Sequence, residues 1–207
     1  MKENKDFVEN TKKEKVSANT KTLCECAILL ATSIALSFFS ITPGSFGGSI
    51  TPASMLPILF VGLRHGPKWG FGTAFVYSIF QLVTGLSYFS YINGFGPYTI
   101  CLLFDFVLAF TALGISSFAK PKKSENGDNK INLVKIFSFI TLAMFVRFIC
   151  HFISGITIWR SFDIYDNPWI YSLVYNVVYM LPEIAISLTV AGILLSTKKL
   201  RNFILIK

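Results

Sequence analysis

Long apolar segments alternate with short polar ones along most of this 207-residue chain. Most of the apolar segments are close to the ~20 residues that an α-helix needs to cross a bilayer. Backbone polar groups cannot stay unpaired in hydrocarbon, and the segments lack the alternating pattern of barrel strands, so the pattern predicts helices. We expect six transmembrane helices, the second too short to span fully, at about 23–41, 53–64, 69–84, 98–119, 133–159 and 169–195.

The composition supports the same class of protein. Hydrophobic residues make up 53% of the chain and charged residues only 14%, well below the charge of a soluble domain. The sequence therefore predicts an all-α integral membrane protein whose membrane domain covers residues 23–197. Residues 1–22 hold six lysines and four acids, which favours a disordered basic tail, and 198–207 form a second basic tail.

The distribution of basic residues predicts the orientation in the membrane. All but two of the 19 Lys and Arg residues lie in four polar segments, 1–22, 64–68, 120–135 and 198–207. Because basic segments stay on the cytoplasmic side, both termini should be cytoplasmic. The same rule accounts for the net charge of +8, so no nucleic-acid partner is needed.

Three alanines recur every fourth residue in the first apolar segment. Ala27, Ala31 and Ala35 would form one smooth ridge on a helix. Small residues let helices approach closely in lipid. The ridge fits either packing within the chain or docking of another membrane subunit.

Polar residues inside the apolar segments are the candidates for function. At a rise of ~1.5 Å per residue, Asp105, His151 and Asn176 all lie roughly 10–12 Å below the outer surface. An acid, an imidazole and a carboxamide at one level, surrounded by aromatic rings, suit a flat heterocycle that carries positive charge. The surrounding rings are Tyr77, Tyr88, Phe106, Trp159 and Tyr171.

Arg147 and Glu183 lie deeper, near the predicted midplane. An unpaired charge at that depth costs several kcal/mol, so we expect a structural ion pair. The four cysteines lie in apolar segments, and the Cys24 and Cys26 pair lacks the spacing and partners of a metal or redox site. The sequence predicts neither a metal nor a cofactor.

Three motifs, in this order and spacing, resemble those of a known family. They are Leu103-Phe104-Asp105-Phe106-Val107-Leu108-Ala109-Phe110, then Val146-Arg147-Phe148-Ile149-Cys150-His151-Phe152-Ile153-Ser154-Gly155 with Trp159, then Trp169-Ile170-Tyr171-Ser172-Leu173-Val174-Tyr175-Asn176. The chain resembles the thiamine-specific substrate-binding (S) subunits of energy-coupling factor (ECF) transporters from about residue 22 to residue 195.

The resemblance implies a ligand, partners and a location. The ligand would be extracellular thiamine, and the partners a shared transmembrane coupling subunit and two ATPase subunits in a bacterial cell membrane. The matched ridge positions imply that Ala27 and Ala31 contact the coupling subunit. The binding residues would fall on Asp105, His151, Trp159, Tyr171 and Asn176.

The chain departs from the family pattern at two aromatic positions. Phe106 stands where members carry tyrosine, and Tyr77 stands where some carry tryptophan. These departures leave open a related ligand, such as a pyrimidine precursor of thiamine.

Two other functions would also use polar residues inside the membrane: a solo carrier and an intramembrane enzyme. A solo proton-coupled carrier could use Asp105 or His151, although the chain shows no inverted repeat. An intramembrane enzyme would need a second carboxylate or a nucleophile at the level of Asp105, and the sequence offers none. It also has no phosphate-binding Gly-Lys-Ser/Thr loop. We therefore expect a transport protein that is not an enzyme.

Overall fold

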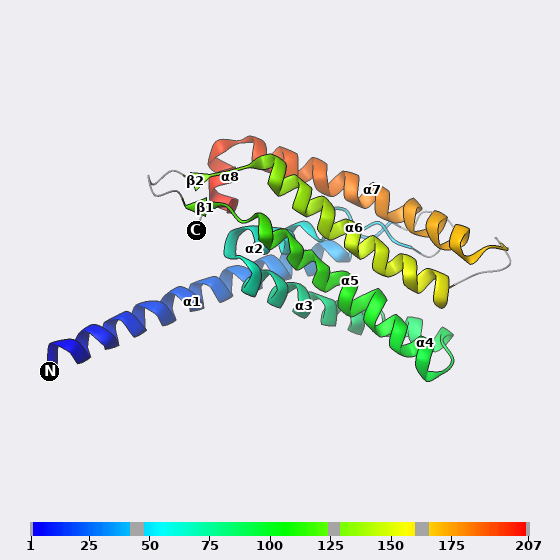
Figure 1. The fold of residues 1–207 in the computed structure, drawn as a ribbon, viewed down its shortest axis with the longest axis horizontal. Coiled ribbons are helices and arrows are strands. Elements are labelled where there is room, and N and C mark those ends of the chain that lie inside the picture. The colour runs from blue at the N-terminus through cyan, green and yellow to red at the C-terminus, as the bar shows by residue number, and fades with distance from the viewer. Residues whose placement is uncertain (1, 42–47, 124–128, 160–165, 206–207) are drawn as a thin grey trace.

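The computed structural model describes residues 2–41, 48–123, 129–159 and 166–205. Apart from loops, an isolated bridge and one pair of two-residue strands, the described chain is helical (Figure 1). Its elements in order are α1 (Lys2–Ser37), α2 (Leu56–His65), α3 (Pro67–Thr84), η2 (Leu86–Tyr91), α4 (Phe95–Ile100), η3 (Cys101–Val107), α5 (Leu108–Thr111), η4 (Ala112–Ala119), β1 (Lys122–Lys123), β2 (Asn129–Lys130), α6 (Leu133–Thr157), α7 (Pro168–Ser196) and α8 (Lys198–Leu205).

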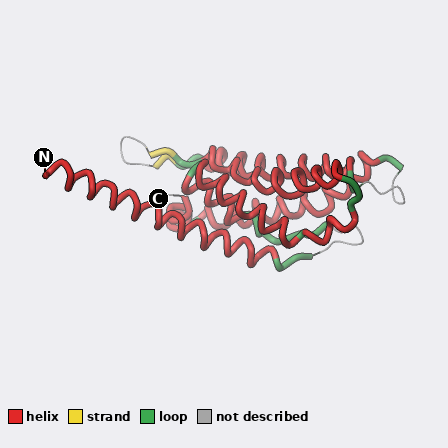
Figure 2. The backbone as a smooth tube through the Cα atoms, turned by 90° about the horizontal axis from the view of Figure 1, so that it is seen from below, coloured by secondary structure: helices red, strands yellow, loops and turns green. Residues whose placement is uncertain are grey.

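The long helices form an elongated bundle. Figure 2 shows them running roughly parallel to its long axis, with the first turns of α1 projecting beyond one end. Four helical segments in the described chain are long and apolar enough to cross a membrane: Val16–Ser37, Phe95–Ala119, Leu133–Thr157 and Pro168–Ser196. The protein is therefore an all-α, multi-pass membrane protein, as the sequence predicts.

The first helix differs from its prediction at both ends. α1 extends back to Lys2, through the segment 2–22 that is predicted as a basic tail. No Gly or Pro interrupts the chain before Pro43, and Lys and Glu are good helix formers. At the other end α1 stops at Ser37, and Ile41 pairs with Ile50 in an antiparallel bridge, so the expected span 23–41 is four residues too long.

The second predicted span is a short internal helix. α2 has only ten residues, and every one except Arg64 is buried. Pro67 begins α3 directly after the Gly66 turn, where Gly66 adopts a φ of 89° that suits glycine. Neither α2 nor α3 is among the four long apolar segments, so six complete crossings remain a prediction.

The ion pair expected near the midplane has the geometry of a direct contact. Arg147 Nη1 lies 2.9 Å from Glu183 Oε2, with 7% and 1% of their side chains exposed. Thr51 Oγ1 donates to Glu183 Oε1 at 2.5 Å. The Arg147 guanidinium lies 4.9 Å from the ring centroid of Phe110. Each buried charge is thus compensated by an opposite charge and a further polar or aromatic contact.

Replacing Glu183 by Gln should leave the buried charge of Arg147 without its counter-charge. We expect a loss of about 3–5 kcal/mol in the free energy of unfolding. The double variant Arg147→Met/Glu183→Leu removes both charges and should recover most of that loss. Thermal unfolding of the detergent-purified proteins would measure both effects. A Glu183→Gln protein that melts like the wild type would contradict this role for the pair.

Candidate binding site

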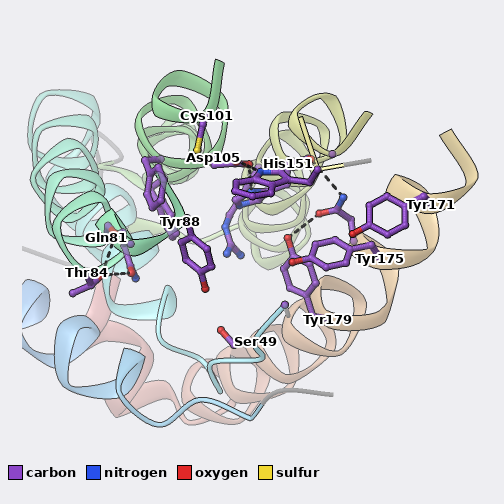
Figure 3. A pocket seen from close by; sticks show the side chains of 18 residues that line it. Ser49, Gln81, Thr84, Tyr88, Cys101, Asp105, His151, Tyr171, Tyr175 and Tyr179 are labelled. Carbon is purple, nitrogen blue, oxygen red and sulfur yellow. Dashed lines mark hydrogen bonds and ion pairs between the residues drawn. The ribbon is translucent and has the colours of Figure 1, made fainter. Parts of the chain in front are cut away.

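A cavity of about 430 Å³ opens between α3, the η3 turn, α6 and α7 (Figure 3). This volume suits a small organic molecule. Figure 3 shows Tyr171, Tyr175 and Tyr179 along one wall and Gln81 and Thr84 on the opposite wall. The lining residues are Gly48, Ser49, Gln81, Thr84, Gly85, Tyr88, Cys101, Asp105, Phe106, Phe110, Arg147, His151, Gly155, Trp159, Tyr171, Tyr175, Asn176 and Tyr179.

A π-helical turn carries the acidic wall of the cavity. Its i to i+5 pattern widens the helix, so residues five apart share one side. Cys101 and Phe106, which are five apart within this turn, both line the cavity, as does Asp105 beside Phe106. Phe106 fits closely against the end of α3, because a Cβ on Gly85 would come within 2.5 Å of its ring. A side chain at Gly85 would displace that wall.

The carboxylate of Asp105 is held by three side chains. Ser154 Oγ and Trp159 Nε1 donate to its Oδ2 at 2.6 and 2.7 Å. His151 Nδ1 lies 3.1 Å from its Oδ1. Among the described residues, Asp105 has no Lys or Arg within ion-pair distance. With a neutral imidazole at His151, the negative charge of Asp105 therefore has only uncharged donors.

Asn176 lies on α7 and lines the cavity where this helix packs against α6. Its Nδ2 donates to the Ser172 carbonyl at 2.8 Å, and its Oδ1 accepts from the Tyr179 hydroxyl at 2.8 Å. The two helices approach closely here, since a Cβ on Gly155 would overlap the Ser172 hydroxyl. Asn176 thus orients Tyr179, and its Oδ1 has a second lone pair that can accept a further hydrogen bond.

Three tyrosines on α7 form an aromatic wall. Tyr171, Tyr175 and Tyr179 are four residues apart and so share one face of the helix. Their successive ring centroids are 5.8 and 5.4 Å apart. Across the cavity, Tyr88 packs edge-on against Trp159 with centroids 6.3 Å apart. The cavity therefore combines one carboxylate with several aromatic rings, which suits a cationic ring system.

The structure places seven of the eight predicted binding residues on this cavity. They are Tyr88, Asp105, Phe106, His151, Trp159, Tyr171 and Asn176. Tyr77 instead lies behind the wall, fully buried, where its hydroxyl accepts from Gln81 Nε2 at 2.6 Å. Tyr77 points inward because it also packs edge-on against Phe110, with centroids 5.5 Å apart.

Sequence reasoning missed several lining residues. Helical spacing could have found Gln81, four residues after Tyr77, and Tyr175 and Tyr179, which follow Tyr171 at the same interval. Arg147 lines the cavity as well as pairing with Glu183. Apart from their positions along the helices, nothing in the sequence marks Cys101 and Thr84 as residues that line the cavity. No cluster of His, Cys, Asp or Glu in the described part of the chain could hold a metal ion.

Apolar helices that enclose a polar and aromatic cavity define a multi-pass membrane protein with a small-molecule site. The family model described as thiamine transporter protein (Thia_YuaJ) matches residues 23–203. The chain belongs to this family. Because the family consists of transporters, the prediction that the chain is not an enzyme is confirmed.

Individual relatives agree with the family assignment. Thiamine transporter ThiT of Bacillus subtilis is 35% identical, over 84% of this chain and 90% of that protein. Thiamine transporter ThiT of Lacticaseibacillus paracasei is 26% identical, over 84% and 86%. A solved structure of ThiT from Listeria monocytogenes shares the fold, with a TM-score of 0.68 and 21% identity, covering 92% of this chain and 100% of that one.

Ser154 is a positioning residue that the sequence did not single out. Its side chain is fully buried and holds Asp105 from behind the cavity wall. Ser154→Ala removes a hydrogen bond to a charged group, which we expect to cost about 1.5–3 kcal/mol of stability. Thermal unfolding should show a lower midpoint for Ser154→Ala. Thr189→Ala, which removes an exposed hydroxyl on α7, is the control, and equal midpoints for the two variants would contradict the role.

Proposed function

We propose that this chain is the thiamine-binding S component of an ECF-type transporter. The observation that carries the proposal is the uncompensated carboxylate of Asp105 in an aromatic cavity. Thiamine has a permanently cationic thiazolium ring, so it would supply the missing positive charge. The thiamine transporter family and its two ThiT relatives support this choice of ligand.

The proposed contacts follow from the geometry of the cavity. Asp105 faces the cationic ring, and Trp159 and Tyr171 enclose the ligand rings. His151 Nε2 is buried and has no hydrogen-bond partner among the described residues. If Nδ1 donates to Asp105, Nε2 accepts a hydrogen bond from an amino group such as that of the pyrimidine. Asn176 contributes its remaining lone pair.

Phe106 fills the wall of the cavity beside Asp105 but carries no hydroxyl group. Its ring stacks on Phe89, with centroids 5.8 Å apart and planes inclined by 23°. A phenylalanine cannot donate the hydrogen bond that a tyrosine hydroxyl would offer. We infer that ring stacking and the Asp105 charge, rather than a hydroxyl at Phe106, select the ligand here.

Intrinsic fluorescence should report thiamine binding. We expect thiamine to quench the tryptophan emission of the purified protein saturably, because Trp159 lines the cavity. Riboflavin and biotin should give no response. Asp105→Asn removes the negative charge and should weaken thiamine binding by about tenfold to a hundredfold.

Trp169 provides the matched control for this titration. It is 60% exposed and does not line the cavity, so Trp169→Phe should retain most of the quenching. Quenching that vanished in Trp169→Phe but persisted in Trp159→Phe would place the ligand elsewhere. Saturable binding of the pyrimidine precursor but not of thiamine would replace the proposed ligand.

We further propose six membrane crossings, with both termini in the cytoplasm of a bacterial cell. The basic segments support this arrangement, since residues 64–68, the β1–β2 hairpin and α8 lie toward the same end of the bundle (Figure 1). The cavity residues on η3, the end of α6 and the start of α7 lie toward the opposite end. The cavity would then receive its ligand from outside.

The alanine ridge of α1 supports docking to a coupling subunit. Ala27, Ala31 and Ala35 are all exposed, so they do not serve packing within the chain. Glu25, on another side of α1, has its Oε2 2.9 Å from Arg64 Nε and 3.1 Å from His65 Nε2. These contacts hold α1 with the ridge facing outward, where a shared transmembrane subunit with two ATPases would bind.

A bulky side chain on the alanine ridge should block thiamine uptake without affecting thiamine binding. Ala31→Trp should abolish thiamine uptake by cells that contain the coupling subunits, while thiamine binding by the purified variant stays normal. Ala185→Trp, at an exposed alanine of α7, is the matched control and should leave both normal. Normal uptake by Ala31→Trp would refute the docking role. Uptake that persists in cells lacking the ATPases would favour a solo proton-coupled carrier.

A further inference from the structure

α8 is a strongly amphipathic helix at the end of the bundle. It begins at Lys198, two residues after α7 ends at Ser196, and Figure 1 shows it turning away from the α7 axis. The Arg201 N–H donates to the Thr197 carbonyl at 2.8 Å, which continues the chain directly into the new helix. Because α7 is a membrane-spanning segment, α8 starts at the membrane boundary.

One side of α8 is fixed to the bundle. Leu205 is only 2% exposed and belongs to the hydrophobic core. Arg64 of α2 donates from Nη1 to the Phe203 carbonyl, and its guanidinium lies 5.8 Å from the Phe203 ring centroid. Arg64 is in turn paired with Glu25 of α1. α8 is therefore an ordered part of the fold, joined to α2 and through it to α1.

The outer side of α8 combines apolar and basic side chains. Phe203 is 74% exposed and Leu200 is 36% exposed. Lys198 and Lys199 are exposed beside them, and no acidic residue occurs on the helix. A shallow groove is lined by Thr197, Lys199, Leu200 and Phe203. An apolar face flanked by lysines is typical of a helix that lies in the membrane interface.

We propose that α8 lies in the headgroup layer and that Lys198 and Lys199 bind the phosphate of an anionic phospholipid. Phe203 and Leu200 would contact the upper acyl chain, and the groove beside Lys199 would receive the lipid. Lipid is favoured over a protein partner because the helix starts at the end of a span and all of its charges are positive. This inference depends on the membrane character of the chain and not on thiamine binding.

A tryptophan at position 203 would report which lipid contacts the helix. Phe203→Trp is made at an exposed side chain, so the fold should be retained, and thermal unfolding would verify this. The variant is reconstituted in bilayers that contain brominated phosphatidylglycerol or brominated phosphatidylcholine, since bromine quenches nearby tryptophan. The extra emission, relative to the parent protein, should be quenched by phosphatidylglycerol at about tenfold lower lipid fraction.

Charge variants on this background identify the headgroup site. Lys198→Gln with Lys199→Gln should abolish the preference for phosphatidylglycerol. Lys68→Gln with Lys135→Gln removes two exposed lysines outside α8 and should preserve it. Equal quenching by the two lipids in the Phe203→Trp protein would overturn the headgroup site. No quenching by either lipid would show that protein or water covers the helix, and would overturn the proposal as a whole.

Discussion

Compensation of buried charge organises the interior of this protein. Glu183 and Arg147 neutralise each other at 2.9 Å, so this part of the bundle carries no net charge. Asp105 accepts from Ser154 and Trp159 and lies beside the His151 imidazole, and among the described residues it has no Lys or Arg partner. The interior of the bundle therefore contains two different acids. Glu183 has its counter-charge in Arg147, whereas the counter-charge of Asp105 can come from a ligand. A cation that enters the cavity gains an electrostatic contact that water would otherwise screen.

Helix geometry explains how so few elements supply the cavity. The tyrosines of α7 follow an interval of four, whereas the η3 residues follow the interval of five that a π turn produces. These two intervals place aromatic rings on one wall and Asp105 on another. Close helix approach at Gly155 lets the Ser172 hydroxyl of α7 donate to the Phe152 carbonyl of α6 at 2.8 Å, and Asn176 holds Tyr179 in place within α7.

The sequence predicted the helical membrane class and most of the cavity because depth along a helix follows directly from residue counts. Asp105, His151 and Asn176 could be assigned to one level in this way, and they share one cavity. Side-chain direction was harder to predict. Tyr77 points behind the wall because Phe110 and Gln81 hold it there, and those contacts depend on tertiary packing.

Helices at the two polar ends of the chain were harder to predict from local pattern. Residues 2–22 lie on α1, where Lys and Glu have high helix propensity, and the basic C-terminal segment includes α8. The two terminal helices meet through Arg64, which contacts both Glu25 and Phe203. A change in the position of α8 would therefore reach α1, the helix that presents the alanine ridge. Through Arg64, the helix proposed to contact lipid and the helix proposed to dock the coupling subunit belong to one mechanical unit at the end of the bundle opposite the cavity.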